Sequence, residues 1–370
     1  MAVTFSFPTT VLFGAGTVRE LPRRLAALGC SKPLLVTDRG LVETPAFRTV
    51  EAMSQGQWPV YAGVTPNPAE GDVELGAEMF RSLECDAVIA LGGGSALDVG
   101  KVLRIRAQWP DVAFRKFDPP ASPPPLAPCI TIPTTAGTGS EVGRSSVVIL
   151  DGRKAVIFHP ALLARLVILD PELTVGLPPK LTAATGADAL THCVESYTSP
   201  EFHPMCEGIA LEGLRLIADA LPRAVRNGTD IDARGKMQVA AMMGGVAFQK
   251  DLGAAHSLAH PLSSLCGLHH GTANALCLPA VMEFNAARKP GVYPRVGESL
   301  GVRNSTDAQA IAAVKKLLAD IGLAGGLRAH GVEPSKLNAL ADQAFEDGCH
   351  KTNPVPVTRD DLYRLYELAM

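Results

Sequence analysis

The 370-residue sequence has no block of like charges: charged residues make up 19% of it, and the formal net charge is −3. A surface of this composition offers a nucleic acid or an anionic membrane no electrostatic partner, so we expect neither. No uninterrupted apolar run approaches the roughly 20 residues that a membrane-spanning helix needs. Residues 1–8 contain no basic region followed by a long apolar run, which argues against a secretory signal.

The eight cysteines are scattered and include no Cys-x-x-Cys pair. In a chain of this length without an export signal, this pattern is typical of reduced, mostly buried thiols. Internal repeats are also absent. These features favour a cytoplasmic globular enzyme, and the length favours two domains, each with its own core.

Short runs rich in Val, Ile and Leu alternate with helical stretches in the first half of the chain. Because these runs are apolar throughout, they are typical of parallel strands that are covered on both faces. Strand–helix alternation of this kind predicts a doubly wound α/β domain. The expected elements are strands at 33–37, 86–91, 129–133 and 166–169 and a helix at 95–107.

The pattern changes at Pro178 and Pro179, after which strand signals almost vanish. Proline fixes φ and is tolerated at a helix start, so the pair suits a domain boundary. We therefore expect an α/β domain at 1–178 and an all-helical domain at 179–370. The helices expected in the second domain lie at 180–197, 205–225, 232–248, 308–321 and 359–370.

A glycine turn, Gly92-Gly93-Gly94-Ser95, follows the strand at 86–91 and opens a helix. Glycines let a backbone approach a diphosphate closely, and a helix N-terminus offers unpaired N–H groups and a partial positive charge. The context favours a dinucleotide site over a tight turn without a ligand. A second small-residue loop, 134–140, also follows a strand, but alone it does not distinguish a phosphate contact from an ordinary loop.

Asp38 ends the strand at 33–37, where a carboxylate can accept hydrogen bonds from a ribose 2′-hydroxyl and repel a 2′-phosphate. This favours NAD over NADP, although an aspartate after a strand is more often a turn or cap residue. Gly14-Ala15-Gly16 resembles the start of a dinucleotide fingerprint, but Arg19 stands where a third glycine is needed. We interpret it as a turn without a ligand.

One carboxylate and several histidines have the spacing of metal ligands. Asp188 and His192 are four residues apart in a helical stretch, which places both on one face. His256 and His260 repeat this spacing, and His270 follows. One carboxylate with three imidazoles suits Fe²⁺ or Zn²⁺. Five candidates remain for about four positions, so the spacing does not say whether His260 is a ligand.

These motifs give the chain a resemblance to the iron-containing (group III) alcohol dehydrogenases, the family of lactaldehyde reductase and 1,3-propanediol dehydrogenase. The resemblance runs from about Phe5 to the C-terminus. The matching motifs are VLFGAG at 11–16, GGGSALDVGK at 92–101, PTTAGTGSEV at 133–142, DPELTVGLP at 170–178, ATGADALTHCVE at 184–195, HSLAHPL at 256–262, HHGTANA at 269–275 and NPVPVT at 353–358.

The resemblance implies a Rossmann-like domain followed by an all-helical domain, the fold shared with dehydroquinate synthases, and association as dimers or larger assemblies. It implies Asp188, His192, His256 and His270 as metal ligands, with His260 a non-ligand beside substrate and nicotinamide. For NAD it implies Asp38, Asn67, Gly93, Gly94, Ser95, Asp98, Thr134, Thr135, Thr138, Val147, Lys154, Leu173 and Leu177.

The implied reaction is hydride transfer between a small primary alcohol or its aldehyde and NAD, with the metal stabilising the alkoxide. His260 is the candidate for proton transfer or substrate orientation. Glu195, one turn beyond His192, is either a hydrogen-bond partner of the metal site or a carboxylate on the helix surface. Lys250 is the candidate contact for a short anionic semialdehyde, as in a 4-hydroxybutyrate dehydrogenase.

Three other interpretations compete with an alcohol dehydrogenase. A dehydroquinate synthase-like lyase shares the two-domain plan, but its metal set resembles one Glu with two His. A maleylacetate reductase keeps the fold without this metal site. A non-catalytic nucleotide-binding protein would not need metal and nucleotide motifs together.

Overall fold

A computed structural model describes residues 5, 7, 9–114 and 125–370. The chain divides into two compact units. The sheet unit comprises Phe7–Thr135 and Ser140–Leu177, and the helical unit includes Pro178–Met370 and the short segment Ala136–Gly139. Among the described residues, no helix combines the length and apolarity needed to cross a bilayer.

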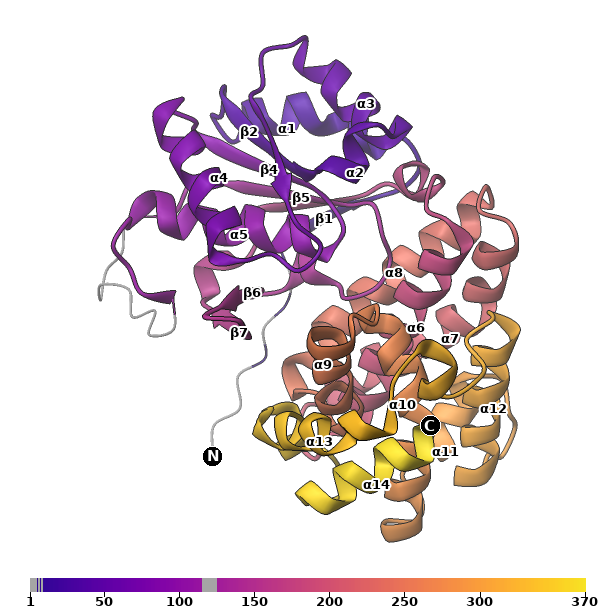
Figure 1. The fold of residues 1–370 in the computed structure, drawn as a ribbon. Helices are drawn as coiled ribbons and strands as arrows, with labels where there is room; N and C mark the ends of the chain where they lie inside the picture. Colours follow the sequence, from indigo (N-terminus) through magenta and orange to yellow (C-terminus); the bar gives the residue numbers. More distant parts are fainter. Residues whose placement is uncertain (1–4, 6, 8, 115–124) are drawn as a thin grey trace. The chain divides into compact units, whose positions relative to one another are not determined.

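The sheet unit is built on six parallel strands in the order β1-β8-β5-β4-β2-β3 (Figure 1). The chain runs outward from β2 to β3, then returns to place β4 on the other side of β2, so the strand order reverses at β2 and β4. Ligands of open α/β sheets bind at the carboxyl ends of strands at such a switch point. The strands are β1 (Thr10–Phe13), β2 (Pro33–Asp38), β3 (Val60–Val64), β4 (Ala87–Gly92), β5 (Cys129–Pro133) and β8 (Leu166–Leu169).

Both faces of this sheet are covered, as its unbroken apolar strands predict. In β2, Leu34 and Val36 pack in one core and Leu35 in the other, and all three are fully buried. Helices α4 and α5 cover the first face, whereas α1 and α3 cover the second. The helices of this unit are α1 (Leu21–Ala27), α2 (Arg39–Val42), α3 (Pro45–Glu51), α4 (Glu70–Ser82) and α5 (Gly94–Gln108).

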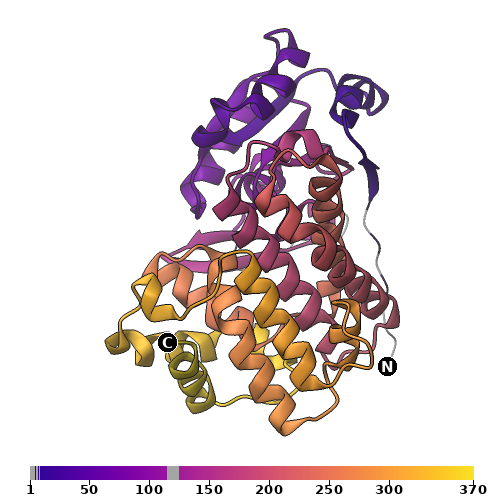
Figure 2. The ribbon, with the colours of Figure 1, turned by 90° about the vertical axis from the view of Figure 1, so that its right-hand side faces the viewer.

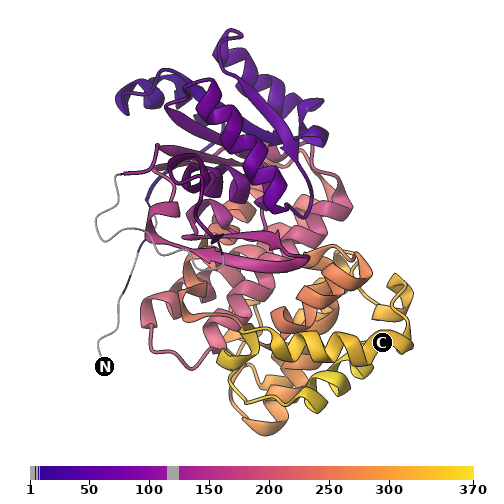
Figure 3. The ribbon, with the colours of Figure 1, turned by 60° about the vertical axis from the view of Figure 1, so that its left-hand side comes forward.

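An antiparallel hairpin, β6 (Ser145–Leu150) and β7 (Arg153–Phe158), forms a separate two-stranded sheet in this unit (Figure 3). Its turn uses Asp151 and Gly152, both with positive φ, as tight hairpin turns require. The strand alternation in β6 is visible in its burial, because Ser146, Val148 and Leu150 are buried and their neighbours are not. No strand was expected from the sequence at either of these two segments.

The helical unit contains no strand, as expected beyond Pro178, and its helices pack side by side around one extensive core (Figure 2). Pro179 and Pro204 occupy first turns, where the missing N–H costs nothing. The helices are α6 (Pro179–Thr198), α7 (Pro204–Arg226), α8 (Ile231–Ala247), α9 (Ala254–Cys266), α10 (His270–Arg288), α11 (Pro294–Ser299), α12 (Asp307–Asp320), α13 (Leu337–Glu346) and α14 (Arg359–Ala369).

Candidate active site

Three of the predicted metal ligands bring their donor atoms together inside the helical unit. Asp188 lies on α6, His256 on α9, and His270 is the first residue of α10. One donor atom from each lies within 4.8 Å of the other two. From Asp188 Oδ1 the distance is 3.7 Å to His256 Nε2 and 3.5 Å to His270 Nε2. Ligands about 2.0–2.2 Å from a tetrahedral ion lie roughly 3.3–3.6 Å apart, so these groups fit a divalent cation.

A glycine allows α10 to begin against α6. A Cβ added to Gly271 would lie 1.9 Å from the carbonyl oxygen of Ala184, a distance that no side chain tolerates. Because Gly271 follows His270 directly, the close contact brings this imidazole to the Asp188 carboxylate.

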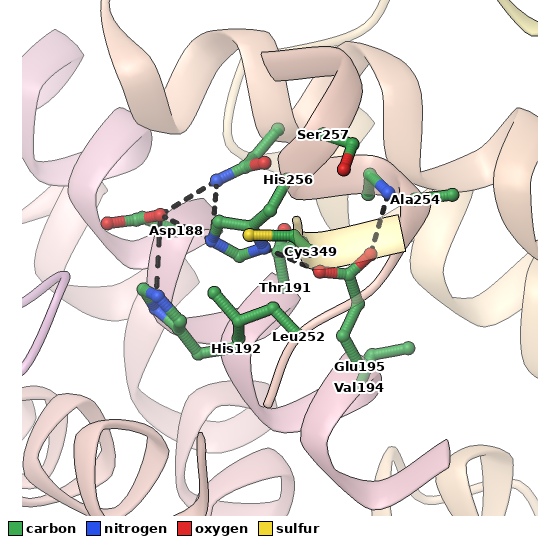
Figure 4. Close-up of polar contacts among 12 residues, drawn as sticks. Asp188, Thr191, His192, Val194, Glu195, Leu252, Ala254, His256, Ser257 and Cys349 are labelled. Atoms are coloured by element: carbon green, nitrogen blue, oxygen red, sulfur yellow. Dashed lines mark hydrogen bonds and ion pairs between the residues drawn. The ribbon is translucent and has the colours of Figure 1, made fainter. Parts of the chain in front are cut away.

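His192 stands one helical turn after Asp188 and on the same face of α6 (Figure 4). Its Nδ1 is 3.9 Å from Asp188 Oδ1, and its ring centre is 4.5 Å from that of His256, so it borders the group of three rather than joining it. Among the described residues, none forms a hydrogen bond with this buried Nδ1. Burial lowers the pKa of His192 to about 4 against the opposing effect of Asp188, so the imidazole is neutral and can serve as a ligand.

Asp188 is an anion in this environment. Burial alone would raise the pKa of its carboxyl, but the three neighbouring histidines outweigh it and hold that pKa well below its usual range. The second oxygen, Oδ2, accepts a hydrogen bond of 3.0 Å from Thr138 Oγ1. The hydroxyl of Thr138, which the resemblance implied at the cofactor, is therefore directed to the predicted metal ligand Asp188 in this structure.

Glu195 is a buried partner of His256, one of the predicted ligands, rather than a surface carboxylate; its side chain is 4% exposed. Its Oε2 is 2.5 Å from His256 Nδ1, and its Oε1 accepts a hydrogen bond of 2.7 Å from the Ala255 backbone N–H (Figure 4). A carboxylate only accepts, so His256 Nδ1 carries a proton, and Nε2 faces Asp188 and His270. Burial lowers the pKa of His256, but Glu195 and Asp188 outweigh it and raise that pKa to about 9, so a metal ion at Nε2 would replace a proton.

His260 lies beside the ligands but makes a different contact. Its ring stacks on His270 with centres 5.2 Å apart, and its Nδ1 is 2.8 Å from Asp347 Oδ2. Asp347 also accepts hydrogen bonds from Ser257 Oγ and the Cys349 N–H, each 2.8 Å long. Burial would raise the pKa of Asp347, but these partners hold it well below its usual range. The ionised carboxylate fixes the proton of His260 on Nδ1.

The glycine turn lies where the switch point of the sheet predicts a ligand. Gly92 has φ +147°, and a Cβ on it would lie 2.8 Å from that of Ala96, so the close turn requires glycine. Gly93 is the N-cap of the 15-residue helix α5 and has no side chain with which to cap it, so the first N–H groups of the helix suit an anion. Asp38, at the end of neighbouring β2, lies within 3.6 Å of the same added Cβ. One of its oxygens caps α2 through the Leu41 N–H.

Four other residues implied at the cofactor gather around this turn. Ser95 Oγ donates to the carbonyl of Pro66, next to Asn67, over 2.7 Å. The Thr134 N–H donates to the Gly92 carbonyl, and the Thr135 methyl borders Gly93. The cradle thus consists of backbone and small side chains, which suits a diphosphate.

The remaining cofactor candidates occupy other positions in the sheet unit. Asp98 accepts hydrogen bonds from Ser140 Oγ and the Val147 N–H and is 3.1 Å from Lys101 Nζ. Its carboxylate therefore links α5 to Ser140 and to β6. Leu173 is buried in the core between the sheet and α3. Lys154 lies on β7 opposite Ile149, and the Leu177 N–H donates to the Thr174 carbonyl.

Lys250 does not present a free cation. Its side chain is 1% exposed, and its Nζ lies 2.8 Å from Glu207 Oε1. The interpretation of Lys250 as the contact of an anionic substrate is therefore wrong for this structure, because the ammonium is already neutralised inside the helical unit.

Comparison with known proteins identifies the family. The model described as "Iron-containing alcohol dehydrogenase" matches residues 8–171, and that described as "Fe-containing alcohol dehydrogenase family, C-terminal" matches residues 182–370. The chain belongs to the iron-containing alcohol dehydrogenase family. It is an alcohol or aldehyde oxidoreductase, and membership implies NAD and a divalent metal ion.

Similar proteins span almost the whole chain. A 4-hydroxybutyrate dehydrogenase of Cupriavidus necator is 40% identical over 96% of both chains. A 1,3-propanediol dehydrogenase of Klebsiella pneumoniae is 35% identical over 98% of this chain and 97% of its own. A crystal structure of a 1,3-propanediol oxidoreductase matches with a TM-score of 0.94 and 34% identity over 100% of both chains. The fold class expected from the sequence is thereby confirmed.

Two functional candidates were missed by the sequence analysis. Asp347, 87 residues from His260, follows no recognisable motif. Asn274 lies within the HHGTANA motif and contacts three ligand atoms, but an asparagine in an apolar helix carries no signal of its own.

Proposed function

We propose that the chain transfers hydride between a small primary alcohol or aldehyde and NAD at an Fe²⁺ centre held by Asp188, His192, His256 and His270. The observation that supports this most directly is the convergence of one anionic and two imidazole donor atoms within 4.8 Å. A divalent cation bound there supplies Lewis acidity to an alcohol or carbonyl oxygen. Zn²⁺ fits the same donors, so metal content must be measured.

His260 is the proposed proton carrier. Asp347 holds its Nδ1, so Nε2 can accept a proton from an alcohol hydroxyl or return one to the product oxygen. The side chain of His260 is 28% exposed, unlike the buried ligands His192 and His256, which leaves it accessible to substrate and solvent. Asp347 itself is a positioning residue, since it acts through the imidazole.

NAD is proposed to bind the sheet unit through its glycine turn, where it would supply the acceptor or donor of the hydride. Asp38 would bind the adenosine ribose, and its charge would repel a 2′-phosphate. The proposed contacts are those that the resemblance implies: Asp38, Asn67, Gly93, Gly94, Ser95, Asp98, Thr134, Thr135, Thr138, Val147, Lys154, Leu173 and Leu177. Of these, Asp98 and Thr138 already hydrogen-bond to other groups and Leu173 is buried, so the proposal depends mainly on the residues around the glycine turn. For Asp38→Gly we expect improved kcat/KM with NADP; unchanged NADP kinetics would place Asp38 away from the ribose.

The decisive experiment is an NAD⁺/NADH assay of Fe²⁺- and Zn²⁺-reconstituted protein with a panel of primary alcohols, ω-hydroxy acids and their aldehydes. Net NADH formation from a simple alcohol distinguishes a dehydrogenase from a lyase that returns its hydride. His270→Ala should lose metal and turnover together while NAD binding survives, because the ligands and the glycine turn lie in different units. A metal-free His270→Ala chain with normal turnover contradicts the assignment.

A second candidate is the reduction of a short anionic semialdehyde, which the 40% identity to a 4-hydroxybutyrate dehydrogenase favours. The test compares a semialdehyde acid with an uncharged aldehyde of equal length. A kcat/KM higher for the acid by about tenfold supports this candidate, since one charge contact contributes that much. Equal values leave the plain alcohol dehydrogenase.

We further propose a cytoplasmic homodimer or larger homo-oligomer, as the family resemblance implies. Light scattering on the purified chain measures its mass directly, and a mass of 38.8 kDa would refute self-association.

A further inference from the structure

The amide of Asn274 lies against the donor atoms that the metal needs. Its Nδ2 is 2.8 Å from Asp188 Oδ1, 3.2 Å from His256 Nε2 and 3.3 Å from His270 Nε2. These are the same three atoms whose mutual distances fit a tetrahedral ion. Asn274 is fully buried and follows His270 by one turn of α10, so its position is fixed by the helix that also carries a ligand.

The chemistry of the contact determines the orientation of the amide. Asp188 is ionised and can only accept, so the group 2.8 Å from its Oδ1 must be the NH₂ and not the carbonyl. One amide hydrogen therefore meets Asp188 Oδ1, and its partial positive charge makes it a weak substitute for a cation, while the other lies toward the imidazole nitrogens of His256 and His270. On the other side of the amide, Oδ1 is buried without a hydrogen-bond partner among the described residues.

A metal ion bound to all three ligand atoms, at about 2.1 Å from each, would use the lone pairs that face the amide hydrogens of Asn274. The ion and the amide therefore cannot both be bound to these atoms. We propose that Asn274 competes with the metal for Asp188, His256 and His270, so that metal binding requires the amide to release these atoms. This inference rests on the proposed metal centre and deepens it: Asn274 lowers metal affinity and stabilises the chain when the metal has been removed.

The test measures metal affinity and thermal stability of the full-length chain, before and after removal of metal by a chelator. Asn274→Ala removes the competing donor, so we expect Fe²⁺ or Zn²⁺ to bind about tenfold more tightly, the worth of one hydrogen bond to a charged group. The chelated variant should melt at a lower temperature than chelated wild type, because the Asp188 carboxylate loses its donor. The metal-loaded proteins should differ much less.

Asn285→Ala is the matched control. Asn285 is a buried asparagine on the same helix, and it pairs with Tyr293 and Asn353 rather than with a ligand. This variant should lower the melting temperature equally with and without metal and leave metal affinity unchanged. Asn274→Asp provides a second variant: its carboxylate should repel Asp188 in the chelated chain and tighten metal binding further.

Weaker or unchanged metal binding in Asn274→Ala overturns the competition. Weaker binding would show that the amide supports the metal-bound state, and an equal loss of stability in both states would show a purely structural side chain. If the wild-type chain binds neither Fe²⁺ nor Zn²⁺, the proposed function and this inference both fail.

Discussion

Glu195 accepts one hydrogen bond from the His256 imidazole and one from the Ala255 backbone, and both bonds are buried. Glu195→Gln keeps the shape but removes the charge that holds the Nδ1 proton. We expect metal affinity to fall about 10–100-fold, the usual effect of losing such a partner, as measured by competition with a chromogenic chelator. Glu212→Gln is the control, because Glu212 is exposed and pairs with Arg215. Unchanged affinity in Glu195→Gln would mean that the helices alone orient His256.

Asp347→Asn tests the positioning of His260. The amide can still meet the imidazole but no longer stabilises its protonated form, so kcat should fall at least about tenfold while KM for NAD stays constant. Asp347→Glu should recover part of the loss, because it restores the charge. Asp342→Asn is the control, because Asp342 lies on α13, the helix that ends just before Asp347, and its exposed carboxylate pairs with Arg359. A loss confined to KM would remove Asp347 from proton transfer.

The helical spacing of Asp188 with His192 and of His256 with His260 marked candidate ligands in the sequence, but it left five candidates for about four positions. Only the family resemblance implied the set Asp188, His192, His256 and His270. Asn274 and Asp347 were not predictable, since their roles depend on contacts that cross 86 and 87 residues of chain. Glu195 could be placed one turn from His192, but only the packing of α9 against α6 shows that its carboxylate is buried.

At the scale of elements, strands such as β5 and β8 and helices such as α6 follow from local composition, because their apolar pattern matches their burial. The β6–β7 hairpin does not, since Ser145, Ser146 and Arg144 interrupt the apolar pattern that a strand of the main sheet would show. The segment Ala136–Gly139 illustrates the same limit: it follows a strand of the sheet unit, yet it packs with the helical unit. A Cβ on Gly139 would lie 2.5 Å from the Ala241 carbonyl of α8.

Lys101 joins three elements of the sheet unit. Its fully buried ammonium on α5 donates to the Ser140 carbonyl and hydroxyl and to the Ser145 carbonyl at the start of β6, and it lies beside Asp98. Lys101→Met leaves Asp98 as a buried charge without its cation, so we expect a loss of about 3–5 kcal/mol in the free energy of unfolding. Lys32→Met, at an exposed lysine, should change it little. Adding Asp98→Asn should recover part of the loss; no recovery would mean that the two charges act independently.

At the scale of the whole molecule, stability is shared between two units with separate cores, so unfolding is expected in more than one step. Metal added to the chain should raise the unfolding temperature of the helical unit, and NAD that of the sheet unit, because each is proposed to bind the folded form of that unit. Differential scanning calorimetry with each ligand separately tests this assignment. A single transition that both ligands shift equally would show that the units unfold together.

Glu141 links the stability of the sheet unit to pH. Its side chain is 4% exposed, and burial raises its pKa to about 7 although Lys101 partly opposes the shift. The folded chain thus binds this proton more tightly than the unfolded chain, whose glutamate titrates near 4.5. The contribution of this bound proton to the free energy of unfolding is complete below pH 4.5. It declines between pH 4.5 and 7 and is lost above pH 7, a change of up to ~3 kcal/mol.

Glu141→Gln should therefore raise the melting temperature relative to wild type at pH 8 but hardly at pH 5. Glu172→Gln, an exposed control, should differ from wild type by the same small amount at both pH values. If Glu141→Gln changes the melting temperature by the same amount at pH 5 and pH 8, the carboxyl of Glu141 ionises in the folded chain without a free-energy cost.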